Sequence, residues 1–216
     1  MELKGKKMLF IGDSITDGVG VTSKEFLYWN RLKADGCIVK GYGNSGTSIS
    51  KHQGELKLDW WKNYFRTRVP QMDDEADVVV VFGGTNDYGR CDSAMGSMND
   101  RTDDTFYGAL HNLFTDLINK YPKACLIAIT PCHRLNENNL YNEVGVRCVG
   151  TLEDYVDAIK EVAAYYAIPV LDLYRISGFQ PEIEENRSLY MPDGLHPSDL
   201  GHERIYNLLK GMLKRL

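Results

Sequence analysis

Two short motifs in the sequence combine a serine with a histidine and a carboxylate. Ser14 lies in the segment GDSITDG (residues 12–18), and Asp193 precedes His196 by three residues in the segment DGLHP (193–197). A serine hydroxyl is a poor nucleophile, so it needs a base such as histidine, and the base needs an acceptor that fixes its tautomer. A turn with this spacing can let the Asp193 carboxylate bond Nδ1 of His196. These residue types are suited to nucleophilic acyl transfer.

Two further motifs contain candidate donors for an oxyanion. Acyl transfer builds negative charge on the carbonyl oxygen, which preorganised N–H groups must stabilise. Gly46, in GNSGT (43–47), can bring its backbone N–H close to a substrate, and Asn86, in GGTND (83–87), can offer its side-chain amide. Each motif also fits an ordinary turn when it is taken alone, because Gly, Asn, Asp and Ser dominate turns.

The elements around these motifs alternate between strands and helices. Apolar runs predict strands at 8–11, 37–42, 78–82, 124–130 and 168–173. Helical spacing and capping signals predict helices at 106–118 and 151–166, a helix opened by the Thr22-x-x-Glu25 capping box, and a final helix after 197–198. The alternation predicts an α/β fold: a single domain over 1–216, built as a three-layer αβα sandwich with a doubly wound, mostly five-stranded parallel sheet.

The motifs follow the carboxyl ends of predicted strands. In an open α/β sheet the ligand site lies at these ends, where we expect the long loops 83–103, 131–150 and 174–197 to form it. Tyr88 and Arg90 come just after Asn86, and Arg134 follows the fourth strand. We predict that these three residues, with Asp13, contact the substrate.

The four motifs together resemble the SGNH hydrolases, also called the GDSL esterase and lipase family. GDSI (12–15) resembles the first block of that family, Gly46 the second, GTND (84–87) the third and DGLH (193–196) the fifth, over a match from residue 8 to about 202. Gly41 stands where the second block often opens with asparagine. The resemblance implies a flavodoxin-like sandwich.

The resemblance also implies a role for each motif residue. Ser14 is then the nucleophile, His196 the general base and Asp193 its orienting acid. The oxyanion hole consists of the Ser14 and Gly46 amides and the Asn86 side chain. No cofactor and no metal is implied.

Members of the family act as esterases, lipases, thioesterases and carbohydrate deacetylases, so the motifs do not choose a substrate. Loops 87–103 and 133–147 are mostly polar and offer mainly Met95, Met98, Leu135 and Leu140 to an apolar groove. A long acyl chain needs a continuous groove of that kind. We therefore expect a short-chain, above all acetyl, ester of a small polar or carbohydrate-like molecule. A lipase or thioesterase for longer chains and a non-catalytic binding module are the alternatives.

Composition restricts the partners. The formal net charge is -5 with scattered basic residues, which argues against nucleic acid, and no apolar stretch approaches the roughly 20 residues that span a membrane. Five cysteines without a Cys-x-x-Cys pair suggest neither disulfides nor a zinc site, and no signal-peptide cleavage site is visible. We expect a cytoplasmic protein, and a homo-oligomer stays open.

Two other patterns give weaker alternatives. Gly41-x-Gly43-x-x-Gly46 formally matches the dinucleotide-binding fingerprint, but the residues after Gly46 read as a loop rather than as the helix that the fingerprint requires. Cys132 beside His133 is a conceivable nucleophile and base, although neighbouring residues rarely point toward each other.

Overall fold

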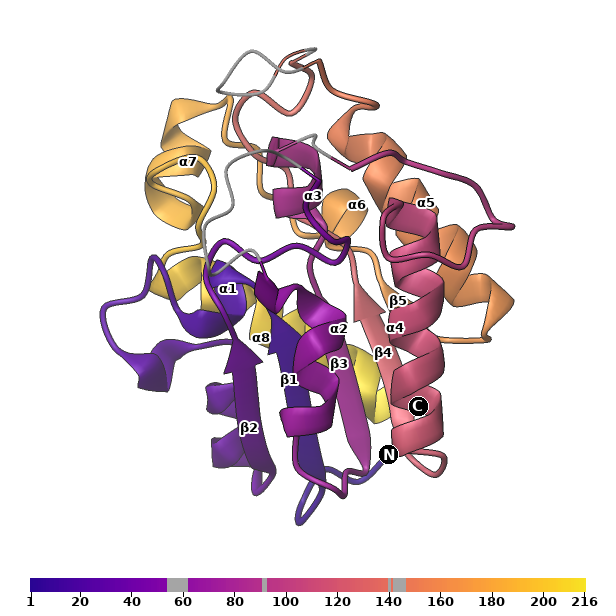
Figure 1. Cartoon of the computed structure of the whole chain (residues 1–216). Helices are drawn as coiled ribbons and strands as arrows, with labels where there is room; N and C mark the ends of the chain where they lie inside the picture. The colour runs from indigo at the N-terminus through magenta and orange to yellow at the C-terminus, as the bar shows by residue number, and fades with distance from the viewer. Residues whose placement is uncertain (54–61, 91–92, 140, 142–146) are drawn as a thin grey trace.

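The structure is a computed structural model that describes residues 1–53, 62–90, 93–139, 141 and 147–216. Its centre is a sheet of five parallel strands: β1 (Lys7–Gly12), β2 (Ile38–Gly43), β3 (Val78–Phe82), β4 (Cys125–Ile129) and β5 (Val170–Leu171). The spatial order is β2-β1-β3-β4-β5 (Figure 1). The chain steps from β1 to one edge and then crosses back to β3, so the sheet is doubly wound, as the sequence predicts.

Helices cover both faces of the sheet (Figure 1). One face packs against α2 (Phe65–Arg68), α4 (Phe106–Lys120) and α5 (Leu152–Tyr165). The other packs against the 3-10 helix η2 (Asn30–Asp35) and α8 (Asp199–Arg215). The three layers form the predicted αβα sandwich.

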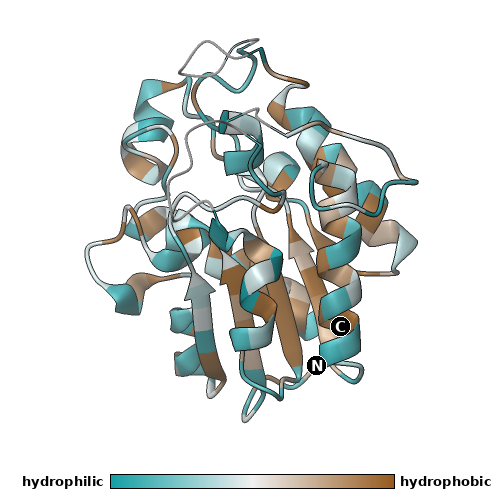
Figure 2. Ribbon diagram, in the orientation of Figure 1, coloured by the Kyte–Doolittle hydropathy of each residue, from teal (hydrophilic) through white to brown (hydrophobic). Residues whose placement is uncertain are grey.

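Strand β3 shows why its sequence is apolar without interruption. Val79 and Val81 point into the cluster under α4 and α5, whereas Val78 and Val80 point into the cluster under α8. All five residues of the strand are buried, and the central strands are the most hydrophobic part of Figure 2. A strand that is covered on both faces has no solvent side that would call for polar residues.

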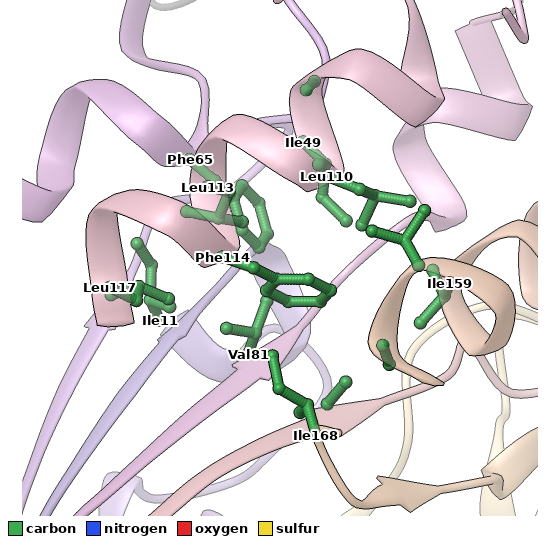
Figure 3. Close-up of a cluster of buried hydrophobic side chains, with 14 of the residues drawn as sticks. Ile11, Ile49, Phe65, Val81, Leu110, Leu113, Phe114, Leu117, Ile159 and Ile168 are labelled. Carbon is green, nitrogen blue, oxygen red and sulfur yellow. The ribbon is translucent and has the colours of Figure 1, made fainter. Parts of the chain in front are cut away.

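Helix α4 supplies much of the first cluster, which Figure 3 shows in close-up. Leu110, Leu113 and Leu117 recur at helical spacing and are fully buried against the sheet, near Ile11 of β1. Burying each such side chain stabilises the fold by roughly 1.5–3 kcal/mol. This packing anchors the sheet whose upper edge carries the chemical motifs.

The predicted helix after Thr22 is wrong. The segment forms only the 3-10 helices η1 (Lys24–Phe26) and η2. Thr22 does not cap a helix of its own: its hydroxyl and amide donate to the Asp199 carboxylate, at 2.6 and 2.9 Å, at the start of α8. A tertiary contact has replaced the local capping box.

Several short helices lie in segments that the sequence predicts as loops. They are α1 (Ser14–Asp17), α3 (Thr85–Arg90), α6 (Leu173–Ile176) and α7 (Glu184–Tyr190), and a 3-10 helix η4 (Val69–Gln71) follows α2. Strand β5 ends two residues early because Asp172 caps α6 by accepting a hydrogen bond from the Arg175 amide. One or two helical turns are too short to show a periodic pattern.

The cysteines differ from the sequence expectation at one position. Cys37, Cys125 and Cys132 are free thiols, but Cys148 is disulfide-bonded. The expectation of a chain without disulfides is therefore wrong, and it no longer supports a cytoplasmic location. Among the described helices, none has the length and apolar character needed to cross a bilayer.

Candidate active site

Ser14 is the first residue of α1, two positions after Gly12, the last residue of β1. Asp13 caps this helix by accepting a hydrogen bond from the Ile15 amide at 3.0 Å. The packing is tight at Gly12, where a Cβ atom would lie 2.0 Å from Oγ1 of Thr16. Glycine at this position thus lets the short helix fold back onto the strand, which holds the Ser14 hydroxyl at the edge of the sheet.

Ser14, His196 and Asp193 form a continuous line of side-chain contacts. Oγ of Ser14 lies 2.9 Å from Nε2 of His196, although 182 positions separate the two residues. Nδ1 of His196 lies 2.6 Å from Oδ2 of Asp193. If Asp193 is ionised it accepts from Nδ1–H, which leaves Nε2 as the acceptor for the serine hydroxyl.

The Asp193 carboxylate also shapes the loop that carries the histidine. Its Oδ1 accepts hydrogen bonds from the amides of Leu195, at 2.9 Å, and His196, at 2.7 Å. Partial burial raises the pKa of Asp193, but the hydrogen bonds from His196 and Leu195 outweigh it and hold the pKa below its usual value. The carboxylate is therefore ionised at neutral pH.

Gly46 lies in a turn that closes through the amide of Thr47, which donates to the carbonyl of Asn44 at 3.3 Å. Gly46 is the third residue of this turn and has a φ of 77°, a conformation that favours glycine. The amide of Ser14, at the start of α1, belongs to the helix N–H groups without an intrahelical acceptor. Both amides follow the carboxyl ends of the neighbouring strands β1 and β2.

Asn86 lies in the first turn of α3, after β3. Its side-chain Nδ2 donates to the carbonyl of Thr47 at 2.9 Å, so Asn86 is tied to the residue that follows Gly46. An amide nitrogen has two N–H groups, and this bond uses one of them. The contact orients the second N–H and links the two predicted oxyanion donors.

Asp87 is a site residue that the sequence analysis did not single out. Its buried carboxylate accepts from the Ile49 amide at 3.0 Å and from the amide and hydroxyl of Ser50 at 2.8 and 2.6 Å. Burial raises the pKa of Asp87. The three bonds fasten the segment after Thr47 to helix α3. Its position beside Asn86 was the available signal, but hydropathy patterns do not reveal a buried carboxylate.

Two of the predicted substrate contacts are buried. Asp13 is 1% exposed, and burial raises the pKa of its carboxyl to about 7 against the opposing hydrogen bond from Ile15 and the charge of Arg68. Tyr88 is 3% exposed and donates its hydroxyl to the carbonyl of Asn136. Asp13 and Tyr88 therefore hold the segments around Ile15 and Asn136 in place.

The two predicted arginines lie around α3. Arg90 is the last residue of this helix. Arg134 donates to the carbonyl and hydroxyl of Thr85, at 3.1 and 3.3 Å, and lies over the Tyr88 ring. With Tyr88 and Gly89, Arg134 lines a pocket of about 100 Å³. Two of the predicted substrate contacts, Tyr88 and Arg134, therefore border this cavity.

The segment after β4 supports the loop of Asp193 and His196. The Leu135 amide donates to the carbonyl of Gly194 at 2.9 Å. His133 faces Glu137, with 2.7 Å between Nδ1 and Oε1. Cys132 is buried, and burial raises its pKa well above the usual value, so its thiol stays protonated. A Cys132–His133 nucleophile pair is not supported.

The alternative sites from the sequence find no support in the described residues. Gly41 and Gly43 lie within β2, and residues 47–53 after Gly46 contain no helix, so the dinucleotide fingerprint lacks its context. Within the described ranges, no group of three or more histidine, cysteine or acidic residues is placed to hold a metal ion.

Comparison with known proteins gives consistent results. The model of the GDSL-like lipase/acylhydrolase family matches residues 10–204. A protein from Lactobacillus plantarum is 31% identical with a TM-score of 0.82, covering 99% of this chain and 98% of its own. No match was found among curated proteins.

Two more distant structures are similar in fold alone. The lipase/acylhydrolase from Enterococcus faecalis is 23% identical with a TM-score of 0.61, over 97% of this chain and 96% of its own. The salicylyl-acyltransferase SsfX3 from a tetracycline biosynthetic pathway is 17% identical with a TM-score of 0.68, over 98% of this chain and 55% of its own.

Proposed function

The chain belongs to the GDSL-like lipase/acylhydrolase family and is thus a hydrolase of ester bonds, and from this premise we propose that it is a serine esterase for short acyl groups, above all acetyl, on a small polar or carbohydrate-like molecule. The observation that carries the proposal is the line of contacts from Ser14 through His196 to Asp193, at 2.9 and 2.6 Å.

Acylation begins with attack of the Ser14 oxygen on the ester carbonyl carbon. His196 accepts the hydroxyl proton at Nε2 as the new C–O bond forms, and Asp193 stabilises the resulting imidazolium through Nδ1–H. The tetrahedral intermediate then expels the alcohol, which takes the proton back from Nε2. The products of this half-reaction are the free alcohol and an acyl ester on Ser14.

Deacylation repeats these steps with water in place of the serine. His196 accepts a proton from the water as the water oxygen attacks the acyl carbon, and it returns that proton to the Ser14 oxygen as the acyl–serine bond breaks. The acid leaves, and the enzyme regains its starting form. Each half-reaction uses the same base and the same orienting carboxylate.

The oxyanion of both intermediates requires N–H donors. The amides of Ser14 and Gly46 and the second N–H of Asn86 supply them in this proposal. Its support is the bond from Asn86 to Thr47, at 2.9 Å, which holds the side-chain donor beside the Gly46 turn before substrate binds. Such preorganisation avoids reorientation during the reaction.

A short acyl group is favoured because the apolar residues of the site loops are engaged elsewhere. Met95 and Met98 pack against the hydrophobic core under α4 and α5. The Leu135 side chain lies against Gly194, where a Cβ atom would meet it at 2.4 Å. Leu140 lies outside the described residues. The pocket beside α3 is small, about 100 Å³, and its lining combines Arg134 and Asn136 with Tyr88, Tyr141 and Cys148.

The test is hydrolysis of p-nitrophenyl acetate, butyrate, octanoate and palmitate at matched solubility, together with acetylated sugars and acyl thioesters. The proposal predicts that kcat/KM falls as the acyl chain lengthens. A rise from acetate to octanoate would favour the lipase alternative, and a preference for thioesters would favour a thioesterase. Absence of turnover together with absence of labelling by a fluorophosphonate would favour a binding module.

A further inference from the structure

Arg68 is a buried cation at the end of α2, only 7% exposed. Burial lowers the pKa of its guanidinium to about 10, which still leaves it charged at neutral pH. Its plane lies over the Phe65 ring, 4.8 Å from the ring centre. A buried charge is costly unless its surroundings compensate it, so the groups that Arg68 contacts show what its position achieves.

Among the described residues, the hydrogen-bond partners of Arg68 lie in the segments that carry the active-site groups. Nη1 donates to the carbonyl of Gly12 at 3.0 Å and to the carbonyl of Tyr42 at 2.5 Å. Nη2 donates to Oγ1 of Thr47 at 3.1 Å. Gly12 ends β1 two residues before Ser14, and Tyr42 belongs to the end of β2. One planar group therefore connects three chain segments in a fixed geometry.

Thr47 transmits this contact to Asn86. Its hydroxyl accepts from Arg68 and donates to the carbonyl of Asn44 at 2.7 Å. The carbonyl of the same residue accepts from Nδ2 of Asn86 at 2.9 Å. Thr47 also directly follows Gly46. Thr47 therefore contacts both the Arg68 guanidinium and the Asn86 side-chain amide.

A neighbouring arginine on the same helix shows a different arrangement. Arg66 bonds Asp116 at 2.7 Å and Asp103 at 3.0 Å, and its side chain is 37% exposed. Asp103 lies in the loop before α4, and Asp116 lies on α4. Arg66 is thus a partly exposed residue that forms ion pairs, whereas Arg68 is buried and bonds the segments of the site.

We propose that Arg68 is a positioning residue that preorganises the oxyanion hole by locking Gly12, Tyr42 and Thr47 together. It does not touch the substrate. It acts through Thr47 on Asn86 and through the strand ends on Ser14 and Gly46. This inference rests on the proposed esterase function.

The decisive experiment compares Arg68→Met, Arg68→Lys and Arg66→Met in the hydrolysis of p-nitrophenyl acetate. Methionine fills similar space without charge or N–H donors. We expect kcat of Arg68→Met to fall roughly 10²-fold with little change in KM, because misplaced donors weaken binding of the transition state rather than of the ester. Lysine keeps the charge but cannot reach three acceptors at once, so its kcat should be intermediate. The matched control Arg66→Met should keep the wild-type kcat.

A double-mutant cycle tests the route through Thr47. Thr47→Val removes the hydroxyl that accepts from Arg68 and donates to Asn44. The double variant with Arg68→Met should lose less than the sum of the two single losses, because the link between Arg68 and Thr47 can be broken only once. Fully additive losses would overturn the proposed route.

Thermal unfolding identifies any variant that does not fold. If Arg68→Met is unfolded, Arg68→Lys decides: a folded lysine variant with reduced kcat and unchanged KM supports the proposal, and one with wild-type kcat overturns it. Ser14→Ala in the same assay separates the two hypotheses. Activity in Ser14→Ala refutes the esterase mechanism, whereas an inactive Ser14→Ala beside a fully active, folded Arg68→Met refutes only the role of Arg68.

Discussion

Replacing Asp193 separates the catalytic role of its carboxylate from its structural role. One oxygen, Oδ1, accepts from the amides of Leu195 and His196, and the other, Oδ2, faces Nδ1 of His196 at 2.6 Å. Asp193→Asn can keep an oxygen toward the two amides and then presents its N–H₂ group to the imidazole. His196 must accept at Nδ1 and carry its proton on Nε2, where it can no longer accept the proton of Ser14.

The expected magnitudes differ between asparagine and alanine. Asp193→Asn should lower kcat/KM roughly 10³–10⁴-fold, because it favours the wrong tautomer, while the melting temperature stays near the wild-type value. Asp193→Ala should also lose activity, but it removes both loop hydrogen bonds. For a half-exposed carboxylate this costs about 1–2 kcal/mol, or roughly 2–8 °C in Tm.

The assay is steady-state hydrolysis of p-nitrophenyl acetate, run beside calorimetric unfolding of all three proteins. We expect both variants to lose activity, because neither fixes the correct tautomer of His196, and only Asp193→Ala to lose stability, because only it removes the two loop hydrogen bonds. An Asp193→Asn enzyme within about tenfold of wild-type kcat/KM would refute the assigned role, because the tautomer would then have no influence on the rate.

Three further outcomes follow from the same structure. Asn86→Ala should lower kcat roughly 10²–10³-fold with a smaller change in KM, and a change in KM alone would make Asn86 a binding residue instead. Burial lowers the pKa of His202 to about 3, so this histidine stays neutral in the folded protein, whereas it is protonated below about pH 6.5 in the unfolded chain. The free energy of unfolding therefore decreases as the pH falls from about 6.5 toward 3. At pH 5 the loss in the free energy of unfolding is about 2 kcal/mol. In chemical unfolding, His202→Gln should lack this part of the pH dependence, and the same slope of unfolding free energy against pH in both proteins would contradict it. Activity should persist in EDTA, and loss reversed by zinc would argue for a metal mechanism.

The fold was predictable because its signals are local and repetitive. Five apolar runs marked the five strands, and the uninterrupted run at 78–82 indicated a strand buried on both faces. Asp193 and His196 were predictable as a pair because they are three positions apart and a single turn brings them together. The prediction that His196 contacts Ser14 depended on the order of the motifs along the chain as well as on their presence.

The parts that were not predictable depend on contacts between distant residues. Nothing local in the sequence distinguishes Arg68 from Arg66, yet only Arg68 is buried beneath the site loops. Thr22 resembles a helix cap but bonds Asp199, 177 positions later. Tyr88 lies two positions after Asn86, but the helical turn directs it into the core. In each case burial and a long-range polar partner decide the outcome.

The central claim is that Ser14 carries the acyl group during turnover. Rapid acid quenching during turnover of p-nitrophenyl acetate, followed by peptide mass spectrometry, measures this directly. We expect a single acetyl group on the peptide that contains Ser14, absent when His196→Ala or Ser14→Ala replaces the wild-type enzyme. An acetyl group found on another residue in the active enzyme, or undiminished turnover in Ser14→Ala, would contradict it.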